Sequence, residues 1–108
     1  MLKIVGYWTE PNDIEGFEKH YREIHLPKAA ALPGLRRLVV TRPVSGFEGG
    51  KPEHYRVAEL VFDDAEALAL CADTPEYRAM RDDAEDIHSK FGTAVTGELG
   101  EEVIVDLG

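Results

Sequence analysis

Apolar residues recur at helical spacing in two segments of the chain, and extended β-branched runs flank both of them. In the first segment the apolar residues are three, four and three positions apart: Ile14, Phe17, Tyr21 and Ile24. In the second segment the spacing alternates between three and four: Tyr77, Met80, Ala84, Ile87 and Phe91. Strand-like runs lie around these helices, at 2–8, 35–42, 54–62 and between 94 and 105. The order strand, helix, strand, strand, helix, strand predicts a ferredoxin-like α+β fold with an antiparallel sheet.

The ends of the first predicted helix are marked by capping and breaking residues. Asn12 or Asp13 is suited to cap its start. Pro27 lacks an amide donor and disfavours helical geometry in the residue before it, so regular helix is predicted to stop or kink near His25.

The second predicted helix has two pieces and a clear end. A short piece at 65–72 precedes the longer one, which opens with Pro75 in the tolerated first-turn position. Gly92 predicts the end of the longer piece. After it, 94–96 and 103–105 are predicted to form two short strands, or one strand with a bulge.

The predicted strands are apolar on both faces. The first strand places Leu2, Ile4 and Trp8 on one face, while Val5 and Tyr7 lie on the other. Two helices on one side of the sheet can cover only one of these faces. The sequence therefore predicts a homodimer in which two sheets pack face to face, giving a dimeric α+β barrel.

Composition and charge restrict the possible partners. The 108 residues, 44% of them hydrophobic, predict a single domain spanning 1–108. Twelve Lys and Arg against 21 Asp and Glu give a net charge of -9, so nucleic acid is not expected to bind. No apolar run approaches the roughly 18 residues of a membrane span. Membrane insertion is therefore not expected, and with a single cysteine, Cys71, a cytoplasmic protein is predicted.

Motifs for common cofactors do not occur in the sequence. There is no glycine-rich phosphate loop, dinucleotide fingerprint, nucleophile elbow or zinc pattern, so no cofactor is predicted. The remaining candidates for proton chemistry are four histidines: His20, His25, His54 and His88. His54 and His88, like the acidic pair Asp82 and Asp83, are expected at the solvated surface.

His25 is the histidine best placed for chemistry, because it lies closer than His20 to the apolar face of the first helix. An imidazole held over the sheet by the interruption at Pro27 can donate or accept a proton near neutral pH. The structural alternative is a helix cap, in which the imidazole interacts with the negative end of the helix dipole. Glu23 follows His20 by three residues but faces water, so this pair is not expected to bind a metal.

Aromatic residues near the predicted sheet could line a pocket for an apolar or aromatic molecule: Tyr7, Trp8, Tyr21, Tyr55 and Tyr77. The alternative is that they are ordinary core residues, since their spacing is also that of a packed strand or helix face.

The first helix and the turn that follows it resemble the signature of the EthD-like family, small bacterial proteins named for a component of ethyl tert-butyl ether degradation. The resemblance lies in FEKHYREIHLP at 17–27 and LPGLRR at 32–37. Within it, the family's aromatic residue, histidine and proline correspond to Tyr21, His25 and Pro27. The length and the predicted order of elements extend the similarity over the whole chain.

The resemblance implies a dimeric α+β barrel of ferredoxin-like subunits, each with a cleft between sheet and helices and with His25 near it. Members of the family are tied to the oxidative catabolism of small organic molecules. Relatives that share the barrel include polyketide cyclases, muconolactone isomerases and monooxygenases.

The hypothesis is a cytoplasmic homodimer of bacterial catabolism that binds a small apolar or aromatic molecule, with His25 as acid or base. Tyr21, Tyr7, Trp8 and Pro27 are the candidate substrate-binding residues. The expected reaction is a cofactor-independent oxidation, isomerisation or cyclisation. The rival is a non-catalytic accessory or carrier protein for an oxygenase system, with His25 only a helix cap, and haem binding through a histidine is a third hypothesis.

Overall fold

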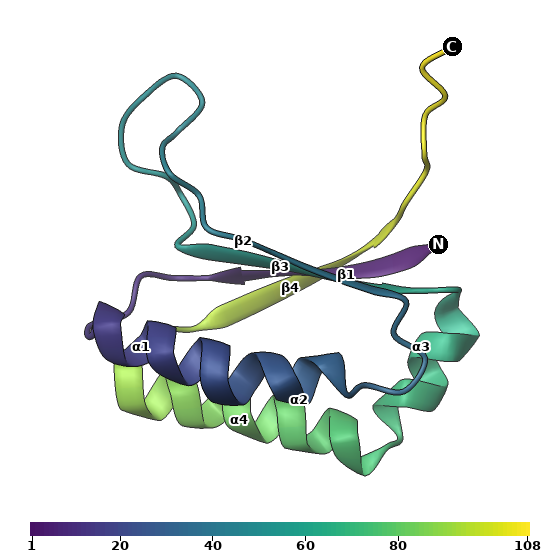
Figure 1. Ribbon diagram of the computed structural model, residues 1–108, viewed down its shortest axis with the longest axis horizontal. Helices are drawn as coiled ribbons and strands as arrows, with labels where there is room; N and C mark the ends of the chain where they lie inside the picture. The colour runs from purple at the N-terminus through teal and green to yellow at the C-terminus, as the bar shows by residue number, and fades with distance from the viewer.

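The computed structural model describes all residues, 1–108, and shows a four-stranded sheet with helices on one face (Figure 1). The elements in chain order are β1 (Leu2–Trp8), α1 (Ile14–His20), the π-helical turn η1 (Tyr21–His25), α2 (Leu26–Ala30), β2 (Arg37–Thr41), β3 (Arg56–Phe62), α3 (Ala65–Ala72), α4 (Pro75–Phe91) and β4 (Val95–Glu101). The strand order is β2-β3-β1-β4, and every neighbouring pair is antiparallel. The predicted ferredoxin-like α+β fold is confirmed.

The core lies between the sheet and the two rows of helix beneath it. One row is the continuous segment α1, η1 and α2, and the other is α4, which lies beside it (Figure 1). Alternation along β1 sends Trp8 toward the helices, where it contacts the buried Phe17 and Tyr21. Ile87 of α4 completes this cluster from the other row. The apolar stripe of α4 packs as the sequence predicts, whereas in the first helix row only Phe17 and Tyr21 of the predicted stripe are buried, and Ile14 and Ile24 are 43% and 42% exposed.

Side-chain caps begin the helices where the sequence places them. The Asp13 carboxylate accepts a hydrogen bond from the Gly16 amide at 3.0 Å, and Thr74 accepts one from the Tyr77 amide at 3.2 Å. Gly92 ends α4 with a φ of 68°, a left-handed conformation that glycine adopts without a steric penalty. The predicted ends of α4 are confirmed.

The interruption predicted near His25 is present, but the helix does not end there. The chain passes through η1, in which the Leu26 amide donates to the Tyr21 carbonyl five residues back, and then continues to Ala30. Pro27 has no amide proton and its ring collides with the carbonyl four residues earlier in a regular α-helix. A wider π turn accommodates this defect without ending the helix, which the sequence pattern alone did not predict.

The end of the chain differs from the prediction. A single strand, β4, spans Val95–Glu101, whereas 103–105 belong to no strand and their side chains are exposed. Leu2 is opposite Glu101 in the ladder, and the Glu102 amide donates to the Met1 carbonyl at 2.7 Å. The pairing of β4 with β1 therefore extends as far as this bond and does not include 103–105.

The outer face of the sheet, opposite the helices, is not covered by any element of the chain (Figure 1). It carries Val5 and Tyr7 but also a group of ion pairs. Lys3 Nζ lies 2.7 Å from Glu59 Oε1 and 3.5 Å from Glu102 Oε2. The outer face is therefore more polar at one end than the alternation of the strands predicted.

Candidate functional site

Two histidines and one aspartate form a buried polar cluster between the two helix rows. His25 Nδ1 lies 2.8 Å from Asp83 Oδ2, and His20 Nε2 lies 2.9 Å from Asp83 Oδ1. Asp83 is only 3% exposed and His25 6%. Because a carboxylate can only accept, His25 carries its proton on Nδ1 and donates it to Asp83. We call these three residues the His20–Asp83–His25 cluster.

The π turn explains how both histidines reach one carboxylate. In a regular α-helix, two residues five positions apart point about 140° away from each other. His20 and His25 are separated in this way, and their positions on an ideal helix would place them on either side of the apolar face. The wider turn η1, which ends at His25, rotates the two imidazoles toward a common side. Pro27, which favours the wider turn, therefore acts on the site through backbone geometry.

The charge states in the cluster follow from burial and from hydrogen bonding. Burial lowers the pKa of His25 below its usual value, although Asp83 acts in the opposite direction. Burial alone would raise the pKa of Asp83, but hydrogen bonds from His20 and His25 outweigh it and hold that pKa below its usual value. At neutral pH, Asp83 is therefore ionised and His25 is neutral, with the lone pair of the imidazole on Nε2.

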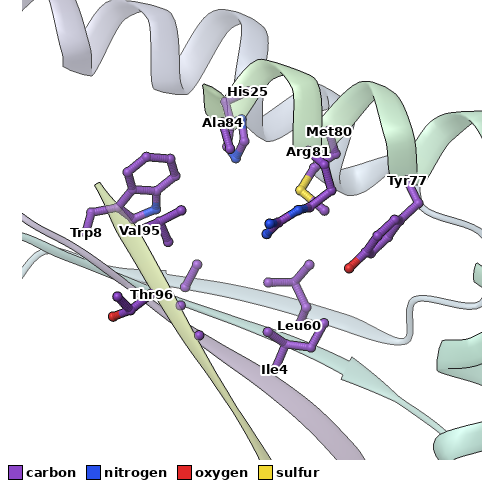
Figure 2. A pocket seen from close by; sticks show the side chains of 13 residues that line it. Ile4, Trp8, His25, Leu60, Tyr77, Met80, Arg81, Ala84, Val95 and Thr96 are labelled. Carbon is purple, nitrogen blue, oxygen red and sulfur yellow. The ribbon is translucent and has the colours of Figure 1, made fainter. Parts of the chain in front are cut away.

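His25 borders a cavity, and its ring lies at the edge of that space (Figure 2). The volume of the cavity is about 110 Å³, and its walls come from β1, β3, β4 and α4. The lining is mostly apolar and includes Trp8, Leu60 and Met80. His25 Nε2 makes no hydrogen bond within the chain, and it is not among the polar atoms sealed from solvent. The unprotonated nitrogen is therefore available to a molecule in the cavity.

The cavity continues into a broader hollow at the surface. This hollow has a volume of about 580 Å³ and shares four lining residues with the inner cavity: Ile4, Tyr77, Arg81 and Gly97. Tyr77 and Arg81 lie on consecutive turns of α4, at the junction of the two spaces (Figure 2). A ligand can place a small reactive portion beside His25 and a larger apolar portion outside.

The structure brings together some of the predicted site residues and separates others. Trp8 and His25 both line the cavity, and their rings meet edge to face at 5.6 Å. Tyr21 stacks on His25 at 5.6 Å within the core but does not line the cavity. Pro27 is exposed on α2. Tyr7 lies on the outer face, against the ring of His54, because alternate residues of β1 point to opposite faces of the sheet.

Asp83 is the residue that the sequence interpretation missed. It was expected to be solvated, together with the neighbouring Asp82, which is indeed exposed. Asp83 follows Met80 by three residues and precedes Ile87 by four, so it lies on the apolar stripe of α4. An acid at such a position requires buried donors, and this signal was present in the spacing.

The structure does not support His25 as a helix cap. The chain remains helical from His25 to Ala30, so the imidazole is not at a helix end. Its Nδ1 donates to a side chain of another helix, α4, rather than interacting with the last carbonyls of its own. His25 is therefore held by a hydrogen bond between two helix rows and not by a contact within its own helix.

No group of three or more His, Cys, Asp or Glu side chains is arranged to hold a metal ion. No helix is long and apolar enough to cross a membrane. The inner cavity beside His25, of about 110 Å³, is smaller than the roughly 300–1,000 Å³ of typical ligand pockets, so a larger ligand must extend into the outer hollow.

The sheet, the single helix layer and the enclosed cavity between them define an α+β ferredoxin-like protein with a histidine–carboxylate pair at an apolar cavity. The chain belongs to the EthD family, since the model of the EthD domain matches residues 10–89. This confirms the resemblance seen in the signature around His25.

Solved structures agree with this assignment. An ethyl tert-butyl ether degradation (EthD) family protein from Bacillus halodurans is 33% identical, with a TM-score of 0.85 over 95% of this chain and 99% of that one. An EthD-like protein from Ralstonia eutropha is 17% identical, with a TM-score of 0.71 and coverage of 98% and 95%. SnoaB, a cofactor-independent oxygenase from Streptomyces nogalater, is 15% identical, with a TM-score of 0.64 and coverage of 99% and 97%. The last two show the fold alone, and no protein with a curated description matches.

The lowered pKa of His25 predicts a pH-dependent stability. Because the unfolded chain binds this proton more readily than the folded one, the contribution is fully present above about pH 6.5 and is lost as the pH falls toward the folded-state pKa of His25. Urea unfolding at several pH values should show a steeper loss below pH 6.5 in the wild type than in His25→Gln. Parallel curves for the two proteins would contradict the expected pKa direction.

Proposed function

We propose that this protein binds a small, mostly apolar organic molecule in the cavity and that His25 moves a proton on it without a cofactor. The observation that carries the proposal is the unpaired Nε2 of a neutral imidazole that borders an apolar cavity while Nδ1 is bonded to Asp83. A general base must be unprotonated at working pH and must have its lone pair directed at the substrate. The lowered pKa of His25 and its position at the cavity support this role.

The geometry supports the following proton movements. Nε2 accepts a proton from an acidic C–H or O–H group of the ligand, and the electron pair of that bond stays on the ligand. The imidazolium that forms is stabilised by the Asp83 carboxylate, 2.8 Å from Nδ1. Return of the proton to a different atom completes an isomerisation or a cyclisation. Alternatively, the ligand anion is oxidised by dioxygen: a C–O bond forms, dioxygen is reduced to the peroxide level, and the proton on Nε2 passes to the outer peroxide oxygen, giving a hydroperoxide.

The neighbouring residues give this step apolar surroundings. Trp8, Leu60 and Met80 line the space around Nε2 with apolar surface. In such surroundings a charge-assisted hydrogen bond such as that between the imidazolium and Asp83 is stronger than in water. Trp8 also fixes one side of the His25 ring by its edge-to-face contact.

Proton abstraction from a general carbon acid tests the proposal. The probe is 5-nitrobenzisoxazole, which opens to a coloured phenolate when a base removes its ring proton. We expect the wild type to accelerate this reaction, with a rate that rises with pH through a midpoint below 6.5, the usual histidine value. His54→Gln, on the outer face, is the control and should retain the activity.

A carrier or accessory role is the other outcome of this experiment. If the probe binds, as seen by quenching of the buried Trp8, but is converted no faster than in buffer, the base role of His25 is contradicted. Ligand binding without proton transfer would then favour the non-catalytic alternative.

We further propose that the protein is a cytoplasmic homodimer, joined through the outer face of the sheet. The helices cover only one face, while Val5 and Tyr7 on the other have no covering element (Figure 1). The loop containing the fully exposed Phe47 and the tail with exposed 103–105 project on this same side. Static light scattering at micromolar concentration should give twice the chain mass of 12.0 kDa. A mass of one chain would contradict the dimer.

A further inference from the structure

We infer that Arg81, assisted by Tyr77, recognises an anionic oxygen of the ligand, so that the substrates are small apolar molecules carrying a carboxylate or an acidic enol or phenol. This inference rests on the proposed use of the same cavity as a ligand site. It adds the chemical class of the ligand and the residues that select it.

Arg81 is placed for recognition rather than for holding the fold. It lines both the inner cavity and the outer hollow, and its guanidinium points toward the cavity (Figure 2). It makes no hydrogen bond or ion pair within the chain. By contrast, Arg36 and Arg56 both bind carboxylates of the chain itself, at Asp63 and Glu18. The donors of Arg81 are therefore free for an external acceptor.

Tyr77 supplies a second unused donor at the same place. It lies one turn before Arg81 on α4, and its hydroxyl also points toward the cavity (Figure 2). This hydroxyl has no hydrogen-bond partner within the chain, and it is not sealed from solvent. A guanidinium and a phenol hydroxyl converging on an apolar space match the two lone-pair directions of a carboxylate or an enolate.

The charged side chains around the cavity favour the binding of an anion only beside Arg81. Arg81 is the one permanently charged side chain that lines the inner cavity, whereas Glu98 lines the outer hollow. The whole chain carries a net charge of -9, so its long-range field does not attract anions. Recognition of an anionic group therefore depends on the local contact with Arg81.

The size of the cavity links Arg81 to His25. Both border a space of about 110 Å³, so one small molecule that fills it contacts both side chains. When His25 removes a proton from the ligand, negative charge develops on the neighbouring group. The oxygen bound by Arg81 then belongs to this group. The cation would lower the energy of this charge, as donors do at developing oxyanions in other enzymes.

The test uses two probes of the same shape, benzoate and the neutral benzamide. We expect the wild type to bind benzoate at least about 10-fold more tightly, measured by titration calorimetry, because a charge-assisted pair with Arg81 is available only to the anion. Arg81→Gln should lower the benzoate affinity by about 10-fold or more and leave benzamide within about twofold. Arg78→Gln, on an exposed position of the same helix, should change neither.

Equal affinities for the two probes, a benzoate preference that survives in Arg81→Gln, or no benzoate binding at millimolar concentration would each overturn the inference. Circular dichroism of Arg81→Gln verifies that the fold is retained. Failure of the proposed function gives a different pattern. In that case benzoate still depends on Arg81, but 5-nitrobenzisoxazole is not converted. Conversely, conversion of this neutral probe without any benzoate preference leaves the role of His25 intact and removes that of Arg81.

Discussion

Replacing His25 with glutamine is expected to lower the rate of proton abstraction from 5-nitrobenzisoxazole by about 10²- to 10⁴-fold. The amide of glutamine has no basic lone pair, so nothing in the cavity can accept the proton of the probe. The rate at a saturating concentration of the probe is measured from the absorbance of the phenolate, either continuously or in a stopped assay. The Michaelis constant should change little, because the apolar walls formed by Trp8, Leu60 and Met80 are untouched.

The glutamine variant is chosen because it separates chemistry from folding. Its amide nitrogen can donate to Asp83 as Nδ1 of His25 does, so the carboxylate keeps a partner. The melting temperature should therefore stay close to that of the wild type. Retention of full activity by His25→Gln would show that another base performs the reaction. A loss of equal size in the His54→Gln control would show that the assay reports dimer or fold integrity instead.

Replacing Asp83 with alanine is expected to lower the free energy of unfolding by about 3–5 kcal/mol. The substitution leaves the donors of two partners, His20 and His25, without an acceptor in a buried environment. It also opens a gap between the two helix rows. Since a domain of this size is stable by only about 5–15 kcal/mol, the effect is large, and urea unfolding measures it directly.

Asp82→Ala is the matched control for this loss, since it removes the same group from the adjacent, exposed position. We expect it to change the unfolding free energy by less than about 0.5 kcal/mol. Similar values for Asp82→Ala and Asp83→Ala would contradict the buried cluster.

A second variant, Asp83→Asn, distinguishes the two roles of this carboxylate. Asparagine keeps one carbonyl acceptor but presents an amide donor to the other histidine, and it cannot stabilise an imidazolium by charge. Activity toward 5-nitrobenzisoxazole should therefore fall by a larger factor than the loss of stability alone explains. An active Asp83→Asn protein would show that Asp83 only fills space between the helices.

The sequence predicted the architecture because its signals were local and repeated. Apolar spacing placed the helices, and Pro75 in the first turn and the stop residue Gly92 bounded α4 within the range observed. The pattern around His25 also identified the family, and it made His25 the candidate for proton chemistry. These conclusions needed only neighbours along one helix or strand.

Interactions between elements account for what the sequence interpretation did not supply. The end of β4 differs from the prediction because it is set by the register between β1 and β4, a pairing between distant segments that the local pattern does not contain. Tyr7 was grouped with His25 because both looked suited to a pocket, although the sheet lies between them. Arg81 is exposed on α4 and also borders the cavity, and only the tertiary structure shows this second position.

The sequence by itself determined the order of strands and helices, the interruption at Pro27 and the candidacy of His25. Only the tertiary structure decided that the interruption is a π turn, that His20 and His25 share Asp83, and that His25 borders a cavity. The physical reason is that these features depend on how two helices lie against each other. Periodicity gives the buried face of each helix, but it does not say which polar groups meet between two such faces.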